Sequence, residues 1–318
     1  MKTISLIALL FPLTLFSQYK LSRNFLDYND NLSYTYENLR LYPIIARDSF
    51  KLAFRNLSKF TSLKQALSQK KVVITEKGNG GSVNNLFIEN VSKDTIIVNC
   101  GEVIKGGQQD RVINTDMVLY PHSGKKDLSV FCVEQGRWSA RNTNAGSTSG
   151  NASFDGYFNF SASGLRKVVT KENNQSKVWE KVSEINTKNK TENSTSTYTA
   201  LDQSTNYNAK MDKYVSFFKG KIDAEKDIVG VIVVSGDKVI GADIFATHDL
   251  FAQNIDGLLH SYATEAIVNG KPVTITQQAV DKYVQDLLSN ETKQEETLKK
   301  KGSKFENNGK KLRISSFD

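Results

Sequence analysis

The stretch that decides the fold is IVGVIVVSGDKVIGADIF, residues 228–245, in which two apolar runs flank a turn at Ser235-Gly236-Asp237. Apolar, largely β-branched residues on both sides of a short turn containing glycine predict a β-hairpin. Amphipathic helices are predicted after it, over residues 249–266 and 276–288, because apolar residues recur there at helical spacing. A hairpin set among helices indicates, together with strands in the first half of the chain, the α+β class.

Short strands dominate the first half of the chain, where apolar residues alternate with polar ones. Short strands at this spacing favour an antiparallel β-sheet or sandwich. A short helix that begins after Ser62 is expected before them, and KKLRISSF, residues 310–317, is a strand candidate at the C-terminus. Further upstream, LRLYPIIARDSF contains a strand candidate that Pro43 is expected to break. The strands expected in the first half cover residues 72–75, 83–90, 94–100, 116–120 and 127–134.

A single α+β domain is predicted for residues 18–318, with polar loops near 139–156 and 186–208. Residues 1–17 have the pattern of a secretory signal peptide, with a positive start, an apolar run and a small residue at the end. That run is too short to favour a membrane span, and no later segment reaches membrane-spanning length. The mature chain is therefore expected to be exported, to the periplasm or outside the cell, without a membrane span.

The formal net charge is +8, and much of the excess lies near the C-terminus. These residues form either a patch for an anionic partner or a solvated tail, and the tail is the favoured interpretation. Only Phe305 interrupts them as an aromatic residue, so a nucleic-acid partner is not expected. The Cys and His residues lack metal-site spacing, so no metal is predicted, and the sequence leaves the cofactor and oligomeric state open. The basic residues concerned are Lys299, Lys300, Lys301, Lys304, Lys310, Lys311 and Arg313.

The densest polar chemistry lies in NCGEVIKGGQQDR, residues 99–111, and in FCVEQGRW, residues 131–138. The glycine pair in the first stretch can bring backbone amides close to an anion, and arginines bind phosphate or carboxylate bidentately. Two carboxylates with pKa values separated by burial can act as general acid and base, so Glu102 and Glu134 are the candidate catalytic residues. The candidate ligand-binding residues are Gly106, Gly107, Gln108, Asp110, Arg111, Gln135, Arg137, Trp138 and Asp243.

The same residues have a second interpretation as a buried polar network that holds two loops together. Asp243, at the end of a hairpin strand, either enters the site or braces the following helix. The two cysteines, Cys100 and Cys132, form either a disulfide or two free thiols at apolar positions. The side chains that would pair with one another in such a network are Gln108, Asp110, Arg111, Glu134 and Arg137.

Five stretches carry a family resemblance: SLKQALSQKKVVITE, VNCGEVIKGGQQDRVINTD, SVFCVEQGRW, SKVWEKV and GADIF…LLHSYATEA. The Gln-Asp-Arg and Cys-Val-Glu-Gln-Gly-Arg-Trp strings among them are long and unusual, and the similarity covers residues 38–318. The chain resembles the ARG-and-rhodanese-phosphatase-associated protein family, a bacterial family of unestablished activity. This resemblance implies a link to ADP-ribose and NAD metabolism, which rests on the neighbourhoods of the family's genes.

Two functions are expected on this basis. The first is an exported hydrolase or transferase that acts on an anionic, nucleotide- or sugar-like small molecule. In it Glu102 and Glu134 transfer protons, while Arg111 and Arg137 bind charge. The alternative is a non-catalytic ligand-binding or envelope-associated module, in which the loop at 139–156 acts as a lid.

Overall fold

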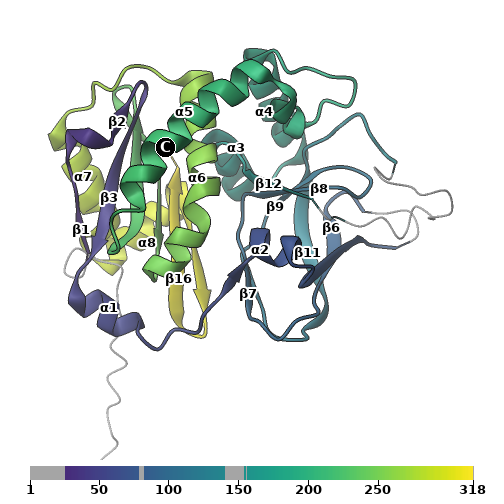
Figure 1. Cartoon of the computed structure of the whole chain (residues 1–318), viewed down its shortest axis with the longest axis horizontal. Helices are drawn as coiled ribbons and strands as arrows, with labels where there is room; N and C mark the ends of the chain where they lie inside the picture. The colour runs from purple at the N-terminus through teal and green to yellow at the C-terminus, as the bar shows by residue number, and fades with distance from the viewer. Residues whose placement is uncertain (1–25, 79–81, 140–153, 155, 318) are drawn as a thin grey trace, which may run out of the picture.

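The computed structural model describes residues 26–78, 82–139, 154 and 156–317. These residues form two packed bodies, a larger one built on a sheet with helices on both faces and a smaller one built mainly of short strands (Figure 1). The class is α+β, as predicted from the sequence. The predicted signal peptide and most of the predicted loop at 139–156 lie outside the described residues.

The larger body contains a seven-stranded sheet in the order β1-β3-β13-β14-β16-β15, with β2 paired to β3. Strands from both ends of the chain meet in it, and all its pairs are antiparallel. The predicted hairpin is confirmed as β13 and β14, joined by a turn in which Gly236 has a φ of +65°. The strands are β1 Leu26–Tyr28, β2 Thr35–Tyr36, β3 Leu39–Ala46, β13 Ile228–Ser235, β14 Lys238–Phe245, β15 Gly302–Asn307 and β16 Lys310–Phe317.

Strand β3 passes through Pro43 without a break, which corrects the expectation that this residue interrupts the strand. Pro43 lies opposite Val231 of β13 on one side, and its carbonyl accepts a hydrogen bond from the N–H of Asn29 on the other. Within a strand the nitrogen and oxygen of one residue point the same way, so the proline nitrogen faces the side where β1 has ended at Tyr28. The missing N–H therefore costs the sheet no ladder bond.

The smaller body contains the predicted antiparallel strands, divided between two sheets. A six-stranded sheet has the order β12-β8-β9-β11-β6-β5, and a three-stranded sheet has the order β10-β7-β4, where β4 and β7 run parallel. The N–H of Phe154 donates to the carbonyl of Ile74 in β5, so the chain before β12 lies beside the opposite edge of the larger of these sheets. The strands are β4 Thr61–Ser62, β5 Val72–Glu76, β6 Asn85–Asn90, β7 Ile96–Val98, β8 Glu102–Lys105, β9 Arg111–Ile113, β10 Met117–Leu119, β11 Gly124–Cys132 and β12 Gly156–Phe160.

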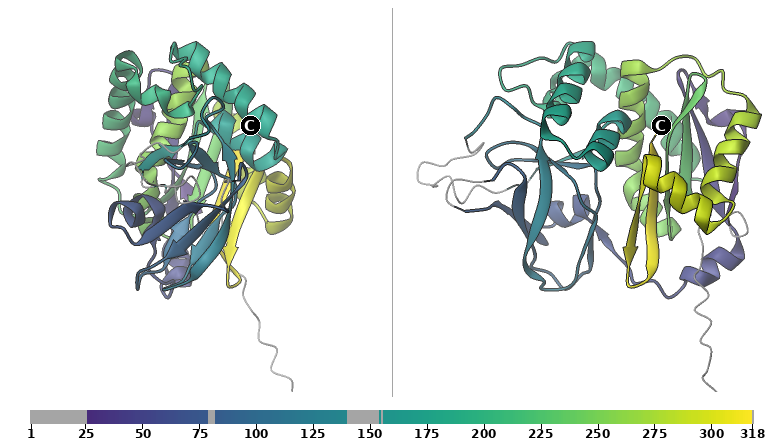
Figure 2. Two further views of the ribbon diagram at one scale, coloured as in Figure 1. Left: turned by 90° about the vertical axis from the view of Figure 1, so that its right-hand side faces the viewer. Right: turned by 180° about the vertical axis from the view of Figure 1, so that it is seen from behind.

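Helices cover both faces of the seven-stranded sheet, with α5 and α6 on one face and α7 and α8 on the other (Figure 2). Hydroxyl caps define where several helices begin: Ser62, Thr247 and Thr276 accept from backbone N–H groups of α2, α6 and α7. The helical elements are η1 Leu32–Tyr34, α1 Asp48–Phe54, α2 Leu63–Ser68, α3 Ser163–Lys167, the π-helical η3 Val168–Glu172, α4 Gln175–Asn189, η4 Tyr198–Gln203, α5 Thr205–Ile222, α6 His248–Asn269, α7 Gln277–Leu288 and α8 Glu291–Lys301.

Two apolar cores stabilise this arrangement. The larger core runs from the seven-stranded sheet and its helices into the smaller body, where Val103, Val112 and Phe131 belong to it. The second core fills the interior of the smaller body between α2 and the six-stranded sheet. Because the larger core spans both bodies, their mutual packing is part of the hydrophobic stabilisation of the fold.

The basic C-terminus is part of the fold rather than a tail, although Lys299, Lys300, Lys304 and Lys310 are exposed to solvent as expected from their charge. In β16, Lys311 is 8% exposed and Arg313 is 3% exposed. The Lys311 ammonium group lies 3.0 Å from a carboxylate oxygen of Glu295 in α8. Carboxylates that are distant in sequence therefore neutralise these cations.

The polar segment 186–208 also differs from the surface loop expected of it. Helix α4 continues to Asn189, and η4 begins at Tyr198, which is buried. Thr197 and Thr199 are buried as well, and their hydroxyls donate to Asp110 Oδ2 at 3.0 and 2.7 Å. These two hydroxyl groups satisfy a buried carboxylate instead of facing water.

Candidate functional site

The glycine pair of the predicted site forms the turn between β8 and β9. Gly107 has a φ of +50°, a conformation that favours glycine. A Cβ atom there would lie 2.1 Å from Phe154 Cζ and 2.7 Å from Glu76 Oε1. The turn therefore needs glycine both for its backbone conformation and for close packing.

Three carboxylates of the protein accept hydrogen bonds from the backbone amide groups of this turn. The N–H of Gly106 donates to Asp110 Oδ1 at 3.1 Å, and the N–H of Gln108 donates to Glu76 Oε1 at 2.8 Å. The N–H of Asp110 donates to Glu134 Oε2 at 3.0 Å. The anion-binding arrangement of amides predicted for this turn is thus present, and side chains of the chain itself supply the anions.

Arg137 fixes the turn from the other side. Its Nη2 donates to Glu134 Oε2 at 2.6 Å, and the guanidinium also donates to the carbonyls of Gly106 and Gly107. Burial alone would raise the pKa of Glu134, but the bonds from Arg137 and from the N–H of Asp110 outweigh it and lower that pKa. Glu134 is therefore an ionised partner of Arg137 at neutral pH.

Arg111 lies under the same turn and is fully buried. Its Nη2 is 3.9 Å from Glu76 Oε1, and the guanidinium carbon is 5.9 Å from the centre of the Trp138 ring. Burial lowers the pKa of Arg111 below its ordinary value. Among the predicted ligand-binding residues, Trp138 is 49% exposed, Gln135 is also exposed and Arg137 is partly exposed.

Glu102, the other predicted catalytic residue, lies at the opposite end of β8. Its carboxylate accepts from the backbone N–H of Asn99 at 2.6 Å and from the hydroxyl of Tyr157 at 3.0 Å. Burial raises the pKa of Glu102 to about 7, although these hydrogen bonds and Arg313 act to lower it. Glu102 is 1% exposed.

Asp243 belongs to a further buried cluster, between β14, β16, α3 and α6. Arg166 donates to both its carboxylate oxygens, at 2.9 and 2.6 Å, and Arg313 Nη2 donates at 2.8 Å. The hydroxyls of Tyr262 and Ser315 complete the set of donors. Burial alone would raise the pKa of Asp243, but the two guanidinium groups outweigh it and lower that pKa well below its usual range.

The structure therefore divides the predicted site among separate networks. Glu134 and its partners surround the β8–β9 turn, whereas Glu102 lies at the start of β8 and Asp243 lies in the hairpin of the larger body. This burial and pairing agree with the second interpretation, in which the polar residues hold loops together. Their roles in catalysis or ligand binding remain predictions.

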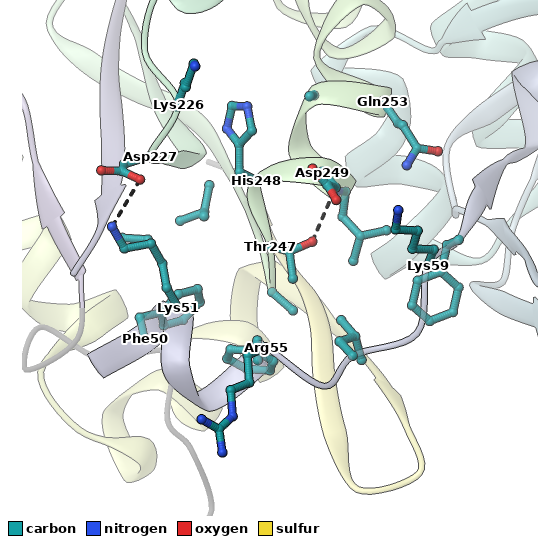
Figure 3. A pocket seen from close by; sticks show the side chains of 18 of the residues that line it. Phe50, Lys51, Arg55, Lys59, Lys226, Asp227, Thr247, His248, Asp249 and Gln253 are labelled. Atoms are coloured by element: carbon teal, nitrogen blue, oxygen red, sulfur yellow. Dashed lines mark hydrogen bonds and ion pairs between the residues drawn. The ribbon is translucent and has the colours of Figure 1, made fainter. Parts of the chain in front are cut away.

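An open groove in the larger body brings together residues that the sequence interpretation did not select. It lies between α1, the segment that follows α1, and the N-terminus of α6, and its volume is about 630 Å³ (Figure 3). Phe50, Phe54 and Phe60 are buried residues that line it, and they give it an apolar floor. Pockets of this size and character hold small molecules.

Cationic side chains surround this floor, as Figure 3 shows. Lys51 is paired with Asp227, with 3.2 Å between its Nζ and a carboxylate oxygen. Within the described parts of the chain, Arg55, Lys59 and Lys226 form no ion pair. The N-terminus of α6 also lines the groove, and helix N-termini favour negative charge. Asp249, in the first turn of α6, also lines the groove without an ion pair in the described chain, so four cations face two carboxylates there and the groove combines an apolar surface with an excess of positive charge.

One signal for the groove is visible in the sequence, in SFKLAFRNLSKF at residues 49–60. Lys51, Arg55 and Lys59 recur every fourth residue, and phenylalanines recur beside them. The contributions of Lys226 and α6 become apparent only when the chain is folded, because they come from segments more than a hundred residues away.

Cys100 and Cys132 are both buried free thiols rather than a disulfide. Burial raises the pKa of Cys100 to about 12, which keeps its thiol protonated. In the parts of the chain that the structure describes, no three His, Cys, Asp or Glu side chains gather as a metal site would require. None of the helices described above combines the length and apolarity needed to cross a bilayer.

The fold and the site define an α+β protein of two packed bodies, with a buried polar turn in one and an open cationic groove in the other. The profile of the ARG and Rhodanese-Phosphatase-superfamily-associated Protein domain matches residues 29–316. The chain therefore belongs to this family, as its resemblance predicts. No curated protein and no solved structure matches the sequence.

Proposed function

We propose that this protein binds a small anionic, nucleotide-like molecule in the groove between α1 and α6. The observation that carries the proposal is the set of unpaired cations, Arg55, Lys59 and Lys226, around an apolar floor. Unpaired positive charge attracts phosphate groups, and apolar side chains favour a base or another flat ring. A nucleotide combines both properties and fits a groove of about 630 Å³.

Binding without turnover is the form of this function that we favour. The catalytic alternative assigns proton transfer to Glu102 and Glu134, and each of these carboxylates is buried among its own hydrogen-bond donors. A general acid or base must lie within hydrogen-bond reach of the reacting group. Neither Glu102 nor Glu134 lines the groove.

The test is a calorimetric titration with ADP, ADP-ribose and AMP, with uncharged adenosine as the reference ligand. Arg55→Gln and Lys59→Gln should each weaken binding of the charged ligands by about tenfold, the value of one charge-assisted hydrogen bond. Adenosine, which lacks phosphate, should bind the wild type and these variants alike. Lys126→Gln, an exposed lysine in β11, is the matched control and should leave every affinity unchanged.

Two results would contradict this assignment. Equal affinities of the wild type and the groove variants for the charged ligands would show that these ligands do not bind in the groove. Loss of binding in Trp138→Ala, with binding by Lys59→Gln unchanged, would place the binding site at the turn between β8 and β9. Chromatography of the incubated ligands tests for turnover in the same samples, and a product that depends on Glu134 would favour the enzyme.

We also propose that the protein acts outside the cytoplasm, because residues 1–17 have the pattern of a signal peptide. Expression of the full chain in a bacterial host, followed by fractionation and N-terminal sequencing, tests this proposal. We expect a periplasmic or secreted product that begins near Gln18. A cytoplasmic product that retains Met1 would contradict export.

A further inference from the structure

A second cavity lies at the opposite end of the β13–β14 hairpin from the groove. Its volume is about 620 Å³, and it is enclosed by the hairpin turn, α3, η3, α4 and the C-terminal end of α6. Three helices contribute charged side chains to its lining, with Lys167 on α3, Lys181 on α4 and Glu265 on α6. The proposal for this cavity does not depend on the function proposed for the groove.

Ser163 provides the first indication of a ligand in this cavity. Its side chain is buried, 3% exposed, and its Oγ has no hydrogen-bond partner, although the residue lines the cavity. A buried hydroxyl without a partner is costly, so proteins normally satisfy such groups with another side chain, water or a ligand. A molecule in the cavity that accepts a hydrogen bond would satisfy Ser163.

The charges around the cavity indicate what kind of molecule this is. Glu265 is already satisfied, because it accepts from the N–H of Gly164 at 3.0 Å and from the Asn269 side chain at 2.7 Å. Of the lysines, Lys181 pairs with Glu184 at 2.9 Å. The remaining three lysines have no carboxylate partner within the described ranges, and they outnumber the two lining carboxylates that form no ion pair there, Glu265 and the exposed Asp237. These lysines are Lys167, Lys238 and Lys271.

We propose that this cavity is a second ligand site, which binds a compact oxyanion of the phosphate class. The Ser163 hydroxyl donates a hydrogen bond to this anion. Lys167, which is half-buried and follows Ser163 by one turn of α3, supplies unpaired positive charge, and the exposed Lys238 and Lys271 supply more. The anion is either inorganic phosphate or the phosphoryl group of a phosphomonoester, since both present the same acceptor oxygens.

The test titrates inorganic phosphate into the full chain at constant ionic strength, with binding followed by calorimetry and by the backbone amide signals in NMR spectra. A parallel titration with glycerol phosphate distinguishes a free anion from a phosphomonoester, and the tighter ligand identifies the source. Phosphate should shift the amide signals around Ser163. Ser163→Ala and Lys167→Gln should each weaken binding about tenfold, while Lys126→Gln, at the exposed lysine of β11, should have no effect.

Thermal unfolding separates this role from a structural one. Because the Ser163 hydroxyl has no partner in the protein, Ser163→Ala should unfold at the wild-type temperature or above it in the absence of phosphate. Added phosphate should stabilise the wild type more than this variant. A lower unfolding temperature for Ser163→Ala without phosphate would overturn the proposal. Equal phosphate affinity in the wild type and both cavity variants would overturn it too, as would no binding of either ligand.

Discussion

Replacing Glu102 with glutamine should remove a large part of the pH dependence of stability. Burial raises the pKa of Glu102 to about 7 in the folded protein, against an ordinary value of 4.5. The folded state therefore holds this proton more tightly than the unfolded state does. The stabilising effect of the protonated form is complete below pH 4.5 and is lost as the pH rises through 7.

The magnitude follows from the separation of the two pKa values. At about 1.4 kcal/mol per pKa unit, the wild type should lose about 3 kcal/mol of unfolding free energy through this one group as the pH rises to 8. Glu102→Gln keeps the shape of the neutral acid and still offers an oxygen to the N–H of Asn99 and an amide group to Tyr157. It should resemble the wild type at pH 4.5 and be more stable by about 3 kcal/mol at pH 8.

Urea unfolding, followed by circular dichroism in half-unit steps from pH 4.5 to 8, measures this difference directly. Glu89→Gln on β6 controls for the loss of one carboxylate from a half-buried position. The free-energy difference between Glu102→Gln and the wild type should widen with pH. A difference that stays constant across the whole range would refute the reasoning, because it would place the same charge on Glu102 in both states.

Three further predictions concern the buried groups. Asp243→Asn should lower the free energy of unfolding by about 3–5 kcal/mol, because it leaves two buried guanidinium groups without their carboxylate; a urea midpoint equal to that of the wild type would contradict this. Gly107→Ala should lower the free energy of unfolding by more than about 3 kcal/mol, because its Cβ would overlap Phe154. Gly78→Ala, whose Cβ would meet no atom within 4 Å, is the control and should lower it by only about 1 kcal/mol. Equal urea midpoints for the two variants would exclude the clash. Cys100, whose pKa burial raises to about 12, and Cys132 should both resist thiol reagents in the native protein and react with them in urea. Rapid labelling of the native protein would contradict this, because it would show that a thiol is exposed.

The parts of the fold that could be predicted from the sequence are those that local periodicity determines. The hairpin at 228–245 and the helix at 249–266 each carry a complete pattern, so they appear in the structure as β13, β14 and α6. The continuity of strand β3 through Pro43 could not be predicted, because the neighbour that makes Pro43 tolerable is a strand end fifteen residues upstream. The role of Arg313 was hidden in the same way, since its partner Asp243 lies 70 residues away. Pairings between distant segments, rather than local preferences, decide these features.

The turn between β8 and β9 shows why its polar sequence did not determine its role. Glycines that expose backbone amides, with arginines nearby, form an anion site whichever anion occupies it. An anionic ligand and a carboxylate of the protein accept the same hydrogen bonds from such a turn. The sequence of residues 99–111 is therefore equally compatible with a ligand site and with a site that a side chain of the protein fills. What distinguishes the two is the position of Glu76, a strand residue 32 positions before Gln108 that supplies the anion from within. The groove differs in this respect, because Arg55, Lys59 and Lys226 have no carboxylate partner in the described chain, and that unpaired charge makes it the better candidate for an external anion.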